Sequence, residues 1–160
     1  MTGVANVGRT GRQQIDGLLT GVKWSAAITY SFPDSAAQYA AGYNSASLVG
    51  LRELSAAQKL ASHFALNDFQ YTQWPGAAPF SVEGFTNLTI SFNNNPGPAN
   101  DIQLANSVDP PTAYAFFPST CDEVGDAFFG RTGTTPVAGN FHWHTVLHEV
   151  GHSLGLKHGH

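Results

Sequence analysis

The stretch HEVGHSLGLKH, residues 148–158, decides how the rest of this sequence is interpreted. On an α-helix, residues four apart lie on the same face, so His148 and His152 can each present a ring nitrogen to one ion at about 2.0–2.1 Å. Gly155 is the residue type expected where a helix ends in a left-handed conformation, and the reversal brings His158 toward the same ion. Three imidazoles leave one coordination position open, which is typical of catalytic rather than structural zinc.

The carboxylate of Glu149 completes the predicted site. Glu149 lies one step around the helix from His148, so it can reach a water molecule on the ion without occupying a coordination position. We therefore predict one Zn2+ ion with three ligands and one catalytic base; the ligands are His148, His152 and His158. The alternative is a histidine-rich helix end that binds no metal. The pattern fixes five positions over eleven residues, and this favours the metal site.

The remaining histidines fit the metal site less well. His144 precedes His148 by four residues and is predicted to lie behind the ligands or to face solvent. His142 and His160 are interpreted as bystanders, with His160 also a minor alternative for the third ligand. His63 lies on the flank of a separate predicted helix and is interpreted as a half-buried structural residue.

Composition excludes several classes of function. The chain has 160 residues, which suits one domain, and carries a formal net charge of −4. Its seven Lys and Arg residues are scattered, so neither a nucleic-acid interface nor a membrane-surface patch is expected. No apolar run approaches the roughly 20 residues that span a bilayer, and no N-terminal signal peptide is recognised. Cys121 is the only cysteine and allows no intrachain disulfide.

Local patterns predict both helices and strands. Residues 1–14 are Gly-rich and expected to be mobile, with order beginning near Ile15. Helical spacing of apolar residues predicts a short helix over 15–22 and a longer one over 55–69, which a capping box of Ser55 and Gln58 begins. Alternation of apolar and polar residues predicts strands over 27–32, 85–92, 102–105, 113–117 and 126–129.

Two further stretches lack a regular pattern. Residues 34–50 are predicted to be an irregular connection that can contain a helical turn. Asp122, Glu123 and Asp126 carry charges that could attract a cation, but they are interpreted as a solvated acidic loop. Helical and extended segments are interleaved without a strict βαβ period, so we expect an α/β or α+β fold with a mixed sheet.

The motif at 148–158 resembles that of the metzincin metalloendopeptidases, and other segments resemble the start of a serralysin-like catalytic domain. These segments are QIDGLL at 14–19 with Gly21 and Lys23-Trp24, ITYSFP at 28–33, TAYAF at 112–116 with Pro118, and Gly125-Asp126 with Phe128. The resemblance implies a zincin-like fold, in which a twisted mixed sheet is backed by two helices near 55–69 and 141–153. It also implies that 15–160 form the N-terminal subdomain of a catalytic domain and that the protein is secreted.

The resemblance further implies a substrate-binding sheet edge beside the cleft, formed by Ala113, Tyr114, Ala115 and Phe116. An exposed edge can accept an extended peptide as an added strand. The alternative is that this strand belongs to the core, and its Phe content fits both. The implied reaction is peptide-bond hydrolysis in protein or peptide substrates, with Glu149 as general base toward a zinc-activated water and then as general acid.

The sequence departs from the family pattern after the third histidine. It ends two residues beyond His158, and Met1 is its only methionine, so the family's methionine turn, lower subdomain and calcium-binding repeats are expected to be missing. A bound Ca2+ is therefore an expectation for a full-length protein only. We expect His158 to lie on an untethered tail, zinc to bind weakly and cleavage to be slow or absent without the missing subdomain or a companion chain.

Two other functions remain open. A catalytically silent zinc-binding module would keep the helix and its histidines, but it has no need for Glu149. A β-rich carbohydrate-binding domain would fit the Asn, Gly and aromatic content but leaves the histidine spacing unexplained.

Overall fold

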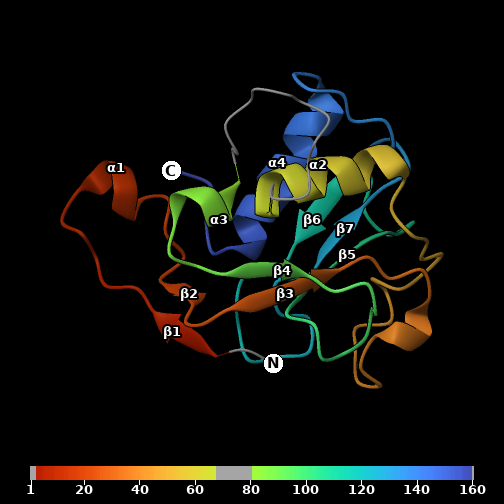
Figure 1. Ribbon diagram of the computed structural model, residues 1–160, viewed down its shortest axis with the longest axis horizontal. Helices are drawn as coiled ribbons and strands as arrows, with labels where there is room; N and C mark the ends of the chain where they lie inside the picture. Colours follow the sequence, from red (N-terminus) through yellow and green to blue (C-terminus); the bar gives the residue numbers. More distant parts are fainter. Residues whose placement is uncertain (1–2, 68–80, 160) are drawn as a thin grey trace.

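A computed structural model describes residues 3–67 and 81–159 (Figure 1). Its elements in chain order are β1 (Val4–Asn6), α1 (Gln13–Asp16), β2 (Val22–Trp24), β3 (Ile28–Ser31), η1 (Ala36–Gln38), α2 (Ala56–Leu66), α3 (Val82–Phe85), β4 (Ile90–Phe92), β5 (Ile102–Asn106), β6 (Ala113–Ala115), β7 (Ala127–Phe129) and α4 (Phe141–Ser153). Within the described residues, five strands form a sheet in the order β4-β3-β5-β7-β6. All neighbours in it pair in parallel except β6, which is antiparallel to β7. The predicted α+β fold with a mixed sheet is confirmed.

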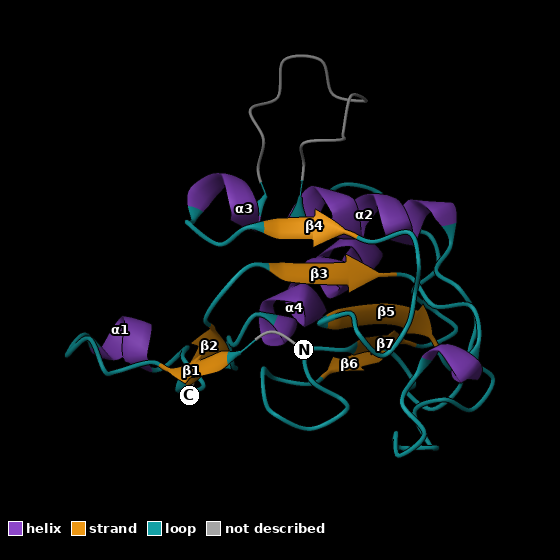
Figure 2. Cartoon of the chain, turned by 60° about the horizontal axis from the view of Figure 1, so that its bottom comes forward, coloured by secondary structure: helices purple, strands orange, loops and turns teal. Residues whose placement is uncertain are grey.

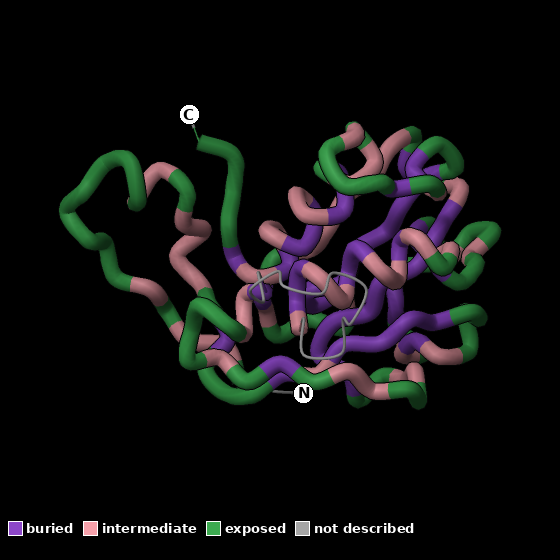
Figure 3. The backbone as a smooth tube through the Cα atoms, turned by 45° about the horizontal axis from the view of Figure 1, so that its top comes forward, coloured by how far each residue is buried: buried purple, intermediate pink, exposed green. Residues whose placement is uncertain are grey.

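Alternating side chains give the sheet two buried faces. On one face, β-strand residues such as Leu104 pack with Val146 and Val150 of α4, and α2 contributes to the same cluster. On the other face, Phe128 packs with Tyr39 in a smaller aromatic cluster. Helices α2 and α4 contact each other behind the strands (Figure 2). The deeply buried part of the chain follows the strands and the inner sides of these two helices (Figure 3).

The capping box predicted for the longer helix is present in α2. The Ser55 hydroxyl accepts a hydrogen bond from the Gln58 backbone N–H at 3.1 Å, and the Gln58 side chain accepts one from the Ser55 N–H at 2.8 Å. The Gln58 amide also donates to Oδ1 of Asn106 in β5 at 2.8 Å, which fixes the helix on the sheet. The helix ends at Leu66, and the predicted end near residue 69 lies outside the described residues.

Regular structure begins earlier than the sequence predicts. β1 pairs with β2 in antiparallel register, and the buried Trp24 lies opposite Val4, so an apolar anchor draws residues 4–6 into a strand. The helix predicted over 15–22 is reduced to the four residues of α1. After a turn at residues 17–18, the chain instead passes the end of α4, where Leu19 forms an antiparallel bridge with Leu156.

The strand predicted over 85–92 is wrong in its first half. The Ser81 side chain accepts from the Gly84 N–H and begins α3, so Phe85 ends a helical turn and is 71% exposed. Only β4, at Ile90–Phe92, is extended. The apolar residues at 85, 88, 90 and 92 do not keep a strict period of two, and this weakens the strand signal.

The acidic loop is not uniformly solvated, which corrects the interpretation of Asp126. This carboxylate is buried and accepts hydrogen bonds from the Tyr43 hydroxyl at 2.7 Å and the Gln103 backbone N–H at 2.6 Å. Burial raises the pKa of Asp126 well above its ordinary value. Asp122 is exposed, as expected. Asp126 therefore joins the loop before β7 to β5 rather than facing solvent.

His63 is half-buried, as predicted, and packs against the rings of Tyr30, Phe32 and Phe92. Its Nδ1 lies 2.5 Å from the Tyr30 hydroxyl, which can donate to it when the ring is neutral. Burial, and then the positive charge of Lys59, lower the pKa of His63.

The lowered pKa predicts an acid-sensitive contribution to stability. The unfolded chain binds a proton at this histidine near its ordinary pKa of about 6.5, whereas the folded state resists it. Stability from His63 is therefore present above about pH 6.5 and lost as the pH falls toward the folded-state pKa. Urea unfolding from pH 8 to pH 5.5 in chelator should show a smaller loss for His63→Gln than for the wild type. Equal losses would contradict this origin.

Candidate metal centre

Helix α4 extends over Phe141–Ser153, the range predicted for it. The Asn140 side chain caps its N-terminus by accepting from the Trp143 N–H at 2.8 Å. One face of the helix is buried, including Val146 and Glu149. At the other end, the indole N–H of the buried Trp24 donates to the Ser153 carbonyl at 2.9 Å. The last turn of the helix is thus held to the β1–β2 ribbon.

The three histidines predicted as ligands bring their Nε2 atoms together. The Nε2 of His148 is 3.1 Å from that of His152 and 2.9 Å from that of His158, and the third distance is 3.1 Å. Nitrogens held by one tetrahedral zinc ion at 2.0–2.1 Å are about 3.3 Å apart. The triangle therefore has nearly the size that zinc requires, although its role as a metal site stays a prediction.

The hydrogen bond at the far side of the His152 ring fixes which nitrogen can bind a cation. Its Nδ1 is 2.7 Å from the Leu156 carbonyl, which can only accept, so Nδ1 carries the proton and Nε2 keeps its lone pair. Burial, followed by the neighbouring histidines, lowers the pKa of His148, which favours its neutral form as well. Three converging imidazole nitrogens fit a zinc ion as donors.

Glu149 is buried beside the histidines, with 6% of its surface exposed. Its Oε2 has no hydrogen-bond partner among the described residues. Burial raises the pKa of Glu149, and the nearby His152 opposes that shift. A buried carboxylate oxygen without a protein partner costs stability. Burial at a cost and a shifted pKa are typical of groups that accept or donate protons at a functional site.

The same histidines and Glu149 line a cleft of about 370 Å³ together with part of β6; its walls are Ala113, Tyr114, Ala115, Phe117, His148, Glu149, His152, Lys157 and His158. Among the described residues, β6 is the last strand on its side of the sheet. The Phe116 N–H donates to the Asp126 carbonyl, and the Gly130 N–H donates to the Thr112 carbonyl. By the antiparallel alternation, the backbone groups of residues 113 and 115 point away from β7 toward the open edge.

The structure separates the fourth predicted edge residue from this cleft. Phe116 does not line it; its ring instead packs against Tyr114 and Phe128 on the aromatic face. Sequence reasoning missed two lining residues. The Phe117 ring meets His152 edge-on with centroids 5.5 Å apart, and Lys157 also lines the cleft. Lys157 lies inside the motif, but Phe117 gave no signal beyond its place at the end of a predicted strand.

His158 does not lie on an untethered tail, which corrects the expectation from the sequence. The carbonyl of Gly155 accepts hydrogen bonds from the backbone N–H of Thr20 at 3.1 Å and from its hydroxyl at 2.8 Å. The Lys157 N–H donates to the Leu18 carbonyl at 2.8 Å. Gly155 has φ +103°, the left-handed conformation predicted for it. The segment that carries His158 is therefore fixed by residues distant in the sequence.

The remaining histidines stay outside the triangle. His144 is exposed on α4, and its ring centroid lies 5.7 Å from that of His148. The His142 Nδ1 lies 3.2 Å from the Thr135 hydroxyl. His160 is outside the described residues. Among the described residues, the group of side chains placed to hold a metal ion consists of the three predicted ligands.

Comparison with known proteins gives one informative similarity. The chain is 29% identical over 144 residues to serralysin of Proteus mirabilis, an alignment that covers 83% of this chain and 28% of that protein. The chain therefore spans less than a third of the relative's length. No protein-family model matches it. Within the described part of the chain, no helix is long and apolar enough to cross a membrane. The similarity supports a distant relationship to serralysin.

Proposed function

We propose that this chain is the zinc-binding part of a zinc-dependent metalloendopeptidase. The observation that carries the proposal is the convergence of three Nε2 atoms within 3.1 Å of one another in a cleft that also contains Glu149 and the open edge of β6. His148, His152 and His158 would hold the ion. The similarity to serralysin points to the same activity and to a secreted protein.

The residues of the cleft suit peptide hydrolysis. Bound zinc supplies Lewis acidity toward a water molecule and toward a peptide carbonyl. The free edge at Ala113 and Ala115 would align an extended peptide through backbone hydrogen bonds. Glu149 would take the proton of the attacking water and then deliver it to the leaving amine. A raised pKa in Glu149 suits this cycle, since one group must both accept and release the proton.

Protein or peptide substrates are the proposed partners, and a further subdomain or companion chain would complete the cleft. The alternative of a silent zinc-binding module remains, because it requires the histidine triangle alone. The unpartnered and buried Oε2 of Glu149 favours the enzyme, since a binding module gains nothing from a carboxylate that costs stability there.

Metal removal and replacement test the proposal. We expect one zinc per chain by elemental analysis, and slow cleavage of casein or a peptide mixture that stops with chelator and returns when zinc is added. His158→Ala should lose most of the zinc, whereas His142→Ala, outside the triangle, should keep it. Zinc binding without chelator-sensitive cleavage would favour the silent module. Absence of zinc binding would reject both functions.

A further inference from the structure

The third histidine differs from the other two in how it is held. His148 and His152 lie on a helix of 13 residues that packs into the core, whereas His158 follows the helix end and is exposed. Its position depends on the course of the backbone over residues 155–157. Ordering a flexible backbone costs conformational entropy, so an unsupported segment would weaken any bond that His158 makes.

We propose that the N-terminal loop, residues 7–21, is the element that positions His158 and thereby sets the zinc affinity of the site. This inference rests on the zinc site proposed above. Besides the hydrogen bonds of Thr20 and Leu18 to residues 155 and 157, an antiparallel bridge joins Leu19 to Leu156. The loop thus pairs with the segment between the helix end and the third histidine through one isolated bridge and the hydrogen bonds beside it.

The N-terminal loop has its own internal support, so it can act as a unit. The Val7 N–H donates to the Gly21 carbonyl at 2.8 Å and closes the loop. Near its tip, the Asp16 carboxylate accepts from the N–H groups of Thr10 at 2.7 Å and Gly11 at 3.1 Å. These bonds connect the two ends of the loop and support its tip.

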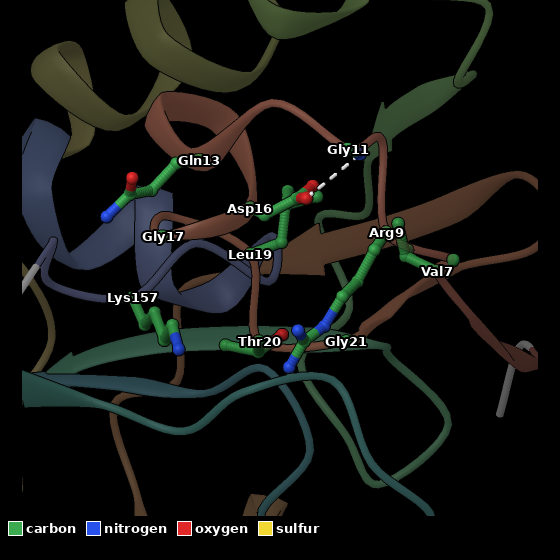
Figure 4. A pocket seen from close by; sticks show the side chains of 11 residues that line it. Val7, Arg9, Gly11, Gln13, Asp16, Gly17, Leu19, Thr20, Gly21 and Lys157 are labelled. Atoms are coloured by element: carbon green, nitrogen blue, oxygen red, sulfur yellow. Dashed lines mark hydrogen bonds between the residues drawn. The ribbon is translucent and has the colours of Figure 1, made fainter.

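A cavity of about 660 Å³ lies within the loop, since its lining residues belong to the loop except for Lys157. Figure 4 shows Val7, Arg9 and Gly11 along one side of this cavity and Lys157 on the other, with Thr20 between Arg9 and Lys157. Residues 8–15 are exposed, and the loop stands out from the molecule (Figures 1 and 3). The contacts of the loop with residues 155–157 are made by Leu18, Leu19 and Thr20, and the side-chain bond among them, that of Thr20, can be removed by one substitution.

When one binding event changes the equilibrium constant of another, the second changes the first by the same factor. If docking of the N-terminal loop favours zinc binding by placing His158, then zinc must favour docking of the loop by the same factor. The loop contains two exposed trypsin sites, Arg9 and Arg12, and Arg131 offers an exposed site on another part of the chain. Loop docking can thus be measured without any assay of catalysis.

The first experiment measures zinc affinity by competition with a chromophoric chelator. Thr20→Val keeps the shape of the side chain and removes the hydroxyl bonded to Gly155, so we expect zinc to bind about tenfold more weakly, the loss typical of residues that orient a metal ligand. Thr20→Ser restores the hydroxyl and should restore the affinity. Ser25→Ala is the matched control, because the Ser25 hydroxyl also bonds a backbone carbonyl, that of Gly3, at 2.7 Å.

The second experiment follows trypsin cleavage by mass spectrometry, with zinc and with chelator. We expect zinc to slow cleavage after Arg9 and Arg12 more than after Arg131 in the wild type, and to lose this selectivity in Thr20→Val. Zinc binding with equal affinity in wild type and Thr20→Val, or equal protection at all three sites, would overturn the inference and leave the zinc site intact. A wild type that binds no zinc would overturn the proposed function itself.

Discussion

Glu149→Gln should reduce peptide cleavage by roughly a hundredfold to ten-thousandfold while zinc remains at one per chain. Proton transfer by a positioned side chain contributes about that factor to a hydrolytic reaction. The amide has nearly the shape of the carboxylate but cannot take up a proton from water. Because the substitution leaves His148, His152 and His158 in place, the metal should be retained. The measurement pairs elemental zinc analysis with the rate of chelator-sensitive cleavage.

The same variant should not lose stability, and this separates a catalytic role from a structural one. Oε2 of Glu149 is buried without a partner among the described residues, and its pKa is raised because burial disfavours the charge. At neutral pH the neutral amide removes that cost, so the free energy of unfolding in chelator should stay equal or rise. Glu53→Gln is the control, since this half-exposed carboxylate pairs with Lys59 away from the cleft. Full cleavage by zinc-loaded Glu149→Gln would reject the general base.

The parts of the site that lie on one helix were predictable because their signals are local. The spacing of His148 and His152 and the position of Gly155 are properties of α-helix geometry, and the structure has the helix and the left-handed residue where they were expected. The capping box at Ser55 is local in the same way. Burial of one helical face and of both faces of the central strands β5 and β7 then determines the layers of the fold.

Other features were missed because they depend on contacts between distant residues. Thr20 and Gly155 are 135 positions apart, and no pattern near either residue announces their hydrogen bonds. Tyr43 and Asp126 are 83 positions apart, so their hydrogen bond is not visible in the sequence. From its sequence neighbours alone, Asp126 is interpreted as part of a solvated acidic loop. β1 has three residues, too few for a periodic signal, and depends on its pairing with β2.

Gly155→Ala should have the largest effect on the assembly of the site. At φ +103° an alanine is strained, and its Cβ would lie 2.5 Å from the carbonyl oxygen of Val22 in β2, a backbone atom that cannot turn aside. The left-handed conformation alone costs about 1–2 kcal/mol, and the contact adds to it. We expect a loss of at least about 2 kcal/mol in the free energy of unfolding, measured with urea in chelator.

The zinc affinity of Gly155→Ala should also fall, by about tenfold or more. The backbone at residue 155 must shift to relieve the clash, and it then no longer directs His158 toward the Nε2 atoms of His148 and His152. Gly139→Ala is the matched control: Gly139 also has a positive φ, +88°, but its Cβ would meet no atom within 4 Å. That variant should lose about 1–2 kcal/mol and keep its zinc affinity. If both variants lost the same stability, or Gly155→Ala bound zinc like the wild type, the reversal at Gly155 would not be what places the third histidine.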